Sequence, residues 1–262
     1  MSAINIFIDG TWLLVQCAAG QTLANTTEKP NTRFPLDFQK LNAALLEFVQ
    51  NNGGACDHVG SCYIACSIFE LPPDFDDWPS HYLDLTTENI EKTKRSVYAR
   101  GAFVKDALTV GYSSDAVFRP PIKDYIVRKL ATRTYQEKQV DTTVVALLVR
   151  SAITQPHDFH ILVTGDSDIL PAVKTAYPEY TKNVVIATTH PDELKASHRQ
   201  TSFSYLDFDF RVPPFYFQDH ADKLIGGKFV YKCGECGKVF TRLNEISKKA
   251  RPYCINHRPP GS

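Results

Sequence analysis

The sequence predicts an α/β protein with a mainly parallel sheet, followed by a small C-terminal module. Short runs rich in β-branched residues alternate with stretches of helical periodicity, as in a parallel sheet with crossover helices. A chain of 262 residues that is 43% hydrophobic can bury one large core and still form a second, smaller unit. Prolines, aromatics and a Gly-Gly pair interleave over residues 208–229, which is typical of a linker. We therefore place a boundary between residues 1–220 and residues 221–262.

The first half of the larger domain contains three predicted strands and one predicted helix. Residues 3–8 form a short apolar run that predicts the first buried strand. Residues 38–48 place their apolar side chains on one face at helical spacing, which predicts a helix. Residues 59–69 predict the second strand, and the apolar run at 102–104 predicts a third. Residues 71–84 hold three prolines and four aspartates, so we expect a loop or insertion there rather than a core element.

The second half of this domain continues the alternation. Residues 137–153 carry apolar side chains at helical spacing and predict a helix. A strand is expected at 159–164, followed by a helix at 169–176. Residues 184–187 predict the next strand, and residues 202–206 a short last one.

Aspartates follow two of the predicted strands and begin one of the predicted helices. Asp9 ends the first strand, and Asp166 and Asp168 follow the strand at 159–164. Because the carboxyl ends of parallel strands meet at one edge of a sheet, we expect these side chains to lie close together. Asp141 starts the helix at 137–153, and Lys138 shares its face. Grouped carboxylates repel one another unless a cation lies between them, and oxygen ligands suit Mg²⁺ or Mn²⁺.

Each of these residues also has an ordinary structural role open to it. Asp168 can cap a helix, Asp141 can complement the dipole of its helix, and Asp9 can be a turn residue. Lys138 can form a salt bridge with Asp141 or Glu137. Three acidic segments that each fall at a strand end or a helix start are less readily explained in this way, and together they favour a metal site.

Three motifs resemble those of the NYN family of PIN-like ribonucleases. They are Ile-Phe-Ile-Asp-Gly at 6–10, Glu-Lys-Gln-Val-Asp at 137–141 and Thr-Gly-Asp-Ser-Asp-Ile-Leu-Pro at 164–171. Their order and approximate spacing match over residues 3–206, and the Gly-Asp-Ser-Asp element is the most specific part. The resemblance implies a Rossmann-like α/β/α sandwich that cuts RNA with Mg²⁺ or Mn²⁺.

The resemblance also assigns roles to individual residues. It implies that the metal-binding carboxylates are Asp9, Asp141, Asp166 and Asp168. One position departs from the family pattern, because Trp12 stands where the family usually has asparagine, three residues after the first aspartate. This departure calls into question a hydrogen bond beside the metal or the scissile phosphate.

The favoured function is that of a metal-dependent endoribonuclease. The metal would lower the pKa of a water molecule and stabilise charge on the phosphate oxygens, and Lys138 would hold a phosphate or tune the carboxylates. A catalytically weak RNA-binding or adaptor protein is the main alternative, and Trp12 is the feature that favours it. Another alternative keeps the enzyme but replaces RNA with single-stranded DNA.

The C-terminal module has the ligand spacing of a zinc ribbon. Its candidate ligands form a C-x₂-C-x₁₇-C-x₂-H arrangement, made of Cys233, Cys236, Cys254 and His257. Four protein ligands close a tetrahedral site and leave no position for a substrate, so the zinc would be structural. A unit of this size buries little core, and the metal would supply its folding energy.

The same module is basic. Residues 221–262 contain nine lysines and arginines but three acids, so the net charge of about +6 is balanced by about −6 in residues 1–220. Cations interleaved with Phe229, Tyr231, Phe240 and Tyr253 would suit single-stranded nucleic acid. These aromatics could equally form the core of the module, and docking to a protein partner is also open.

Several other classes have little support. No apolar span approaches the length of about 20 residues that crosses a membrane, and the N-terminus lacks a signal-peptide pattern, so we expect a cytoplasmic protein. Seven cysteines, an odd number, favour thiols and metal ligands over disulfides. Cys62 and Cys66 share a face of the second predicted strand, which favours inert core thiols for both and for nearby Cys56. Phosphate-binding loops and serine or cysteine nucleophile motifs do not occur.

Overall fold

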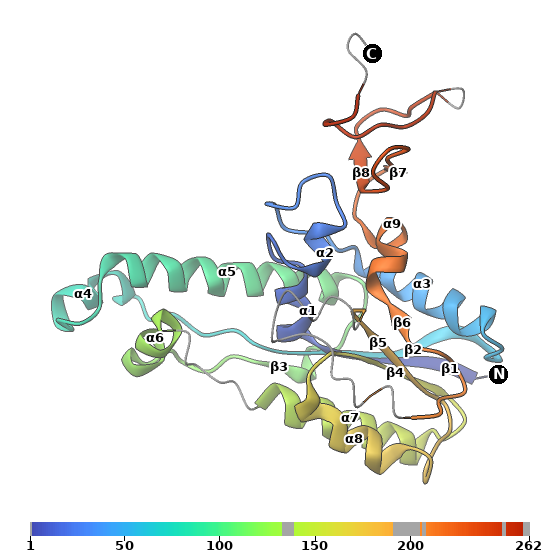
Figure 1. The fold of residues 1–262 in the computed structure, drawn as a ribbon. Coiled ribbons are helices and arrows are strands. Elements are labelled where there is room, and N and C mark those ends of the chain that lie inside the picture. The colour runs from blue at the N-terminus through green and yellow to red at the C-terminus, as the bar shows by residue number, and fades with distance from the viewer. Residues whose placement is uncertain (1, 133–138, 191–204, 206–207, 248–249, 259–262) are drawn as a thin grey trace.

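A six-stranded parallel sheet forms the centre of the protein, with its strands in the order β3-β2-β1-β4-β5-β6 (Figure 1). The structure is a computed structural model, and it describes the chain except for residues 1, 133–138, 191–204, 206–207, 248–249 and 259–262. The strands are β1 (Ser2–Asp9), β2 (Cys56–Ser67), β3 (Val117–Phe118), β4 (Phe159–Val163), β5 (Val184–Thr188) and β6 (Phe215–Tyr216). This is a doubly wound order, in which the direction of strand addition reverses between β1 and β4. The predicted α/β class with a mainly parallel sheet is confirmed.

The long strands agree with the prediction, and the short ones do not. β1, β2, β4 and β5 lie where strands were expected. The strand predicted at 102–104 is wrong, because these residues lie inside the helix α5 (Thr87–Thr109). Phe103 and Val104 are buried there, and a short apolar run fits a buried helix face as well as a strand. β3 and β6 were missed, and β6 lies in the stretch expected to be a linker. Most of the strand predicted at 202–206 lies outside the described residues.

Helices cover both faces of the sheet and give three layers (Figure 1). One face is covered by α1 (Gly10–Gln16), α3 (Phe38–Asn51), α5 and α9 (Ala221–Leu224), and the other by α7 (Gln139–Thr154) and α8 (Leu170–Ala176). Alternating side chains along β1 pack in both layers. Ile4, Ile6 and Ile8 face the first set of helices, and Phe7 faces the second. Helices α3, α7 and α8 match the predicted ones within the described residues.

Residues 71–84 are mostly exposed, as expected of a loop or insertion, but Phe75 and Trp78 belong to a buried cluster, which the prediction did not include. They contain a short 3₁₀ helix at Phe75–Asp77 and α4 (Trp78–His81). Phe75 and Trp78 are buried against residues from the end of β2, from α5 and from α6 (Asp124–Ala131). The aromatic residues between the prolines and aspartates supply this packing. The resulting extension projects to the left of the sheet in Figure 1.

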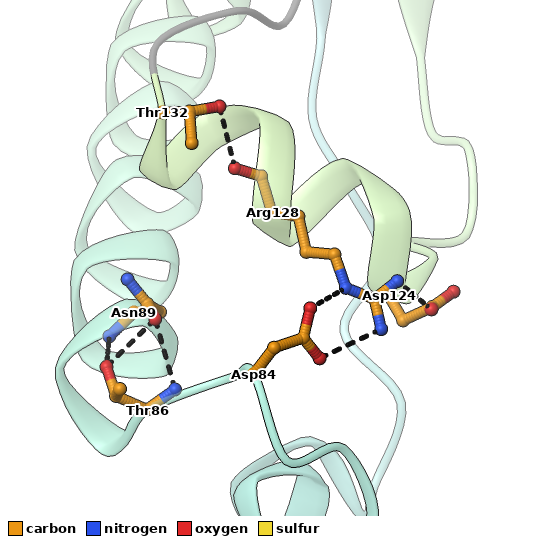
Figure 2. Close-up of polar contacts among 6 residues, drawn as sticks. All are labelled: Asp84, Thr86, Asn89, Asp124, Arg128 and Thr132. Carbon is orange, nitrogen blue, oxygen red and sulfur yellow. Dashed lines mark hydrogen bonds and ion pairs between the residues drawn. The ribbon is translucent and has the colours of Figure 1, made fainter.

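Polar contacts fix the extension at two points (Figure 2). Arg128 of α6 donates to both carboxylate oxygens of Asp84 and also pairs with Asp124, one turn earlier on α6. At the start of α5, the N–H of Asn89 donates to Thr86 Oγ1 at 3.2 Å and the N–H of Thr86 donates to Asn89 Oδ1 at 3.0 Å. Such a capping box contributes about 1 kcal/mol, whereas exposed ion pairs contribute little. The cap therefore defines where α5 begins.

The C-terminal module is a two-stranded antiparallel hairpin of β7 (Phe229–Lys232) and β8 (Val239–Arg242) with the chain that follows it. It lies above α9 in Figure 1. The predicted boundary at residue 220 precedes α9, yet Ala221, Leu224 and Ile225 pack in the core beside the sheet. We use "the body" for residues 2–225 and "the ribbon module" for residues 228–258.

Candidate metal centres

Asp9 ends β1 and begins α1. Its Oδ1 accepts the N–H of Trp12 at 2.9 Å, which caps the helix, and its Oδ2 accepts the hydroxyl of Thr164 at 3.1 Å. Gly10 makes this turn possible, because a Cβ there would lie 2.7 Å from the carbonyl oxygen of Ala65 on β2. Asp9 is thus buried in a fixed orientation at the carboxyl edge of the sheet.

The turn after β4 holds the second acidic segment. Thr164 links it to the first one, because its Oγ1 donates to Asp9 and accepts the N–H of Asp166 at 3.0 Å. Asp166 Oδ1 in turn accepts the N–H of Asp168 at 3.0 Å, at the start of a 3₁₀ helix. The hydroxyl of Thr164 therefore sets the relative position of the two acidic turns, a role that the sequence motifs did not reveal.

Three of the four predicted aspartates form a cluster. Asp9, Asp141 and Asp166 each offer a carboxylate oxygen within 4.8 Å of the others. Asp141 comes from the first turn of α7, and the cluster lies where the strand order reverses between β1 and β4. Asp168 does not belong to this group and is exposed. Lys138 lies outside the described residues.

The charge on this cluster is costly without a cation. Burial raises the pKa of Asp9 to about 7, with smaller upward contributions from the charges of Asp141 and Asp166. The N–H of Trp12 and the hydroxyl of Thr164 oppose this shift without cancelling it. A divalent ion among the three carboxylates would favour their charged forms. Their hard oxygen atoms suit Mg²⁺ or Mn²⁺ better than a soft metal.

Tyr205 packs beside the acidic turn and was not among the predicted site residues. Its side chain is buried, and its hydroxyl donates to the backbone carbonyl of Asp166 at 2.6 Å. Burial raises its pKa, and so do the charges of Asp166, Asp9, Asp141 and Asp168, in that order. Tyr205 therefore stays protonated and keeps donating to the turn after β4. No local pattern in the sequence distinguishes it from an ordinary core tyrosine.

Arg100 brings a permanent positive charge to the same edge of the sheet. Its Nη1 donates to Thr11 Oγ1 at 3.2 Å and to the carbonyl oxygen of Ser67 at 3.4 Å. Thr11 follows Asp9 by two residues, and Ser67 follows Ala65, the strand partner of Asp9, by two residues. Sequence reasoning missed Arg100 because its helix had been assigned in part to a strand.

Trp12 contacts the acidic site through its backbone and not through its indole. The ring lies against Gly165, where a Cβ would be 2.8 Å from Trp12 Nε1, and meets the ring of Phe217 edge-on at 6.1 Å. Among the described residues, Nε1 has no hydrogen-bond partner although it is buried. The side chain therefore fills space beside the turn after β4 and places its polar atom at that turn.

The four predicted zinc ligands of the ribbon module lie together. Cys233, Cys236, Cys254 and His257 offer atoms within 4.8 Å of one another. The Sγ atoms of Cys236 and Cys254 are 3.8 Å apart, and His257 Nδ1 lies 3.1 Å from Cys254 Sγ and 3.8 Å from Cys233 Sγ. A tetrahedral zinc ion with Zn–S bonds of about 2.3 Å separates two sulfur ligands by about 3.8 Å. The residues fit zinc, with the histidine binding through Nδ1.

Backbone N–H groups favour the thiolate form of the first ligand. Desolvation raises the pKa of Cys233, but the N–H groups of Cys254, Cys236 and Glu235 together outweigh it and lower that pKa to about 6. The turn between β7 and β8, which presents the N–H groups of Glu235 and Cys236, has Gly237 in the left-handed region, at a φ of 71°. The turn glycine and the cysteine pair are thus parts of one ligand-binding element.

The aromatic residues of the ribbon module mainly serve its own packing. Phe240 is buried with Cys233 and Cys254, and Tyr231 and Tyr253 pack against this small cluster. These contacts support the interpretation of the aromatics as a core. Phe229 differs, because Lys228 lies over its ring at 5.2 Å from Nζ to the centroid.

Three further cysteines form no cluster with other metal ligands within the described part of the chain. Cys56, Cys62 and Cys66 are buried, as expected of core thiols. Burial raises the pKa of Cys62 to about 12 and also raises that of Cys56, so both stay protonated. In the same described part, no helix combines the length and hydrophobicity needed to cross a membrane.

Comparisons with protein families, with characterised proteins and with solved structures gave no match to this chain. The two candidate centres are therefore interpreted from their own geometry and chemistry.

Proposed function

We propose that the chain is a metal-dependent endoribonuclease of the PIN-like type. The observation that carries this proposal is the convergence of Asp9, Asp141 and Asp166 within 4.8 Å of one another. Each comes from one of the three motifs that resemble the NYN family, although the motifs are far apart in the sequence. The cluster also lies at the reversal of strand order, where open α/β sheets bind their ligands.

The arrangement suits phosphodiester hydrolysis. A divalent ion supplies a Lewis acid that activates water and neutralises charge on the phosphate. Asp9, Asp141 and Asp166 would hold that ion, and their neighbours orient them. Asp9 is fixed by the Trp12 N–H and the Thr164 hydroxyl, and Tyr205 fixes the carbonyl of Asp166. Ligands held in this way need little rearrangement when the substrate binds.

Arg100 would bind a phosphate of the substrate next to the metal. Its guanidinium is anchored to Thr11 and Ser67, within two residues of Asp9 and of its strand partner. Arginine presents several N–H groups in a plane that matches phosphate oxygens. We assign to Arg100 the phosphate-binding role expected of Lys138, which Lys138 could share.

A second candidate function is that of an RNA-binding or adaptor protein with weak catalysis. Trp12 favours it, because its indole packs on Gly165 and, among the described residues, its Nε1 makes no hydrogen bond to the carboxylates in place of the family asparagine. The basic ribbon module would then provide RNA or protein binding. A nuclease acting on single-stranded DNA would use the same centre.

One assay separates these functions. Labelled single- and double-stranded RNA and DNA are incubated with Mg²⁺, Mn²⁺ or EDTA and with wild type, Asp141→Asn or Asp106→Asn. Asp106 is exposed on α5 and serves as the matched control. We expect metal-dependent internal cuts in RNA by wild type and by the control, and none by Asp141→Asn. Binding without cutting would favour the adaptor, and cuts in DNA alone would change the substrate.

A further inference from the structure

A loop of the body forms part of the ribbon module. Residues 26–28 run beside β8, where the N–H of Val239 donates to the carbonyl of Thr26 and the N–H of Glu28 donates to the carbonyl of Val239, both at 2.9 Å. The side chain of Val239 is buried in the core of the body. Lys40 adds a contact below the hairpin, donating to the carbonyl oxygens of Ile225 and Gly227. The module is therefore joined to the body by more than its covalent link.

Glu28 extends from this loop to the second pair of zinc ligands. Its side chain is only 6% exposed, and its Oε2 accepts the N–H of Ile255, next to Cys254, at 2.9 Å. Its Oε1 lies 3.6 Å from Nη1 of Arg242. Burying a carboxylate is costly unless a cation and hydrogen-bond donors lie beside it, and the module supplies both.

Arg242 completes the arrangement from the other side of the same ligand. Its Nη2 donates to the carbonyl oxygen of Tyr253 at 3.2 Å, and its guanidinium lies 4.6 Å from the centroid of the Phe240 ring. The Tyr253 carbonyl belongs to the peptide group before Cys254, and the Ile255 N–H belongs to the peptide group after it. The pair formed by Glu28 and Arg242 therefore holds both peptide groups that flank one zinc ligand.

We propose that Glu28 of the body, together with Arg242 of the ribbon module, positions Cys254 for zinc, so that the metal site is complete only when the module is docked on the body. Rotation of either flanking peptide would swing the Cys254 side chain away from Cys236 and His257, to which it is now 3.8 and 3.1 Å distant. Zinc binding and docking then stabilise each other. This inference does not depend on the proposed nuclease activity.

The opposing interpretation is that Glu28 only attaches the module, with no influence on the metal. The two differ in one observable, because mere attachment would affect the melting temperature and not the release of zinc. Residues behind metal ligands typically change metal affinity by about 10- to 100-fold when they are removed.

The test measures zinc release from the full-length, zinc-loaded protein to a chromogenic chelator. We expect Glu28→Ala and Arg242→Ala each to weaken zinc binding by about 10-fold or more. Glu28→Gln retains an acceptor for the Ile255 N–H and should lie between Glu28→Ala and wild type. Glu245→Ala removes an exposed acid of the same module and should match wild type.

Two outcomes would overturn the proposal. One is zinc release from Glu28→Ala at the rate of Glu245→Ala, whatever its melting temperature. The other applies if Glu28→Ala does not fold. Glu28→Gln, which keeps the volume of the side chain, is then compared with wild type, and identical zinc release from the two would contradict the proposal. Melting curves with and without chelator provide the second readout, and the proposal requires the chelator to destabilise wild type more than Glu28→Ala.

Discussion

The two candidate metal centres are built in opposite ways. The aspartate centre draws its ligands from three segments between residues 9 and 166, and the sheet brings them together. The cysteine-histidine centre takes all its ligands from one stretch between residues 233 and 257. In the first, the sheet and its helices hold unfavourable charges close together without a metal. In the second, a metal would organise a chain too short to bury much core of its own.

The largest effect is expected from removing a zinc ligand. Cys254→Ser, or a strong chelator, should release the zinc and unfold the ribbon module, since zinc binding in such units contributes on the order of 10 kcal/mol. The sheet should survive, because within the described residues nearly all of its buried core comes from the body, and the module adds Val239. Circular dichroism and limited proteolysis would measure this unfolding. Cleavage confined to residues beyond 225 would support a body that folds without zinc, and unfolding of the whole protein would contradict it.

Asp9→Asn should abolish activity without destabilising the fold, unlike the loss of a zinc ligand. Loss of a ligand should lower cleavage by about 10³-fold or more, which corresponds to about 4 kcal/mol. The metal-free protein should at the same time become more stable, because a buried charge is removed while asparagine can still accept the Trp12 N–H. Initial rates and thermal melting in EDTA measure the two effects. A variant that is both inactive and less stable would point to a structural role for Asp9.

The pH dependence of the metal-free body should reflect the same buried carboxylate. Because the pKa of Asp9 is raised from 3.8 to about 7, the folded state holds this proton over that interval while the unfolded state has lost it. Stability from this group is therefore lost as the pH rises from about 4 to 7, by up to about 4 kcal/mol. Urea unfolding in EDTA, compared with Asp9→Asn, would isolate the effect. An equal pH dependence in both proteins would argue against it.

The smallest effect is expected at Arg100. Arg100→Ala should weaken RNA binding by roughly 5- to 10-fold and reduce the slope of log affinity against log salt by about 0.7, the value for one phosphate contact. Arg95→Ala removes an exposed charge from the same helix and serves as the control. Calcium-supported binding, measured by fluorescence anisotropy, avoids cleavage. Equal salt-dependence slopes for Arg100→Ala and Arg95→Ala would show that Arg100 does not contact a substrate phosphate.

The sequence predicts local features of this protein better than distant ones. The ligand spacing of Cys233 to His257 is visible in the chain itself, and so are strands as long as β1 and β4. Two-residue strands such as β3 and β6 are too short to show a period of two. The run at 102–104 suits a helix face and a strand equally, so only packing decides between them.

The same contrast holds within the aspartate centre. Motif position indicated Asp9, Asp141 and Asp166, because strand ends and helix starts can be located from hydrophobic patterns. Thr164, Tyr205 and Arg100 act through hydrogen bonds that depend on the tertiary fold. Thr164 begins the third motif, but its contact with Asp9 is not visible there, and no pattern in the sequence distinguishes Tyr205 or Arg100 from ordinary residues.

The wide separation of the aspartates has a consequence for the synthesis of the protein. A ribosome delivers Asp9 early and Asp166 much later, so a nascent chain carries an incomplete centre until β4 and its turn have emerged. An N-terminal fragment lacks the second acidic turn, and a C-terminal fragment lacks β1. If the chain cuts RNA, the messenger that encodes it is not exposed to a finished enzyme during translation of the first half. Truncated products of either half would likewise lack part of the carboxylate cluster.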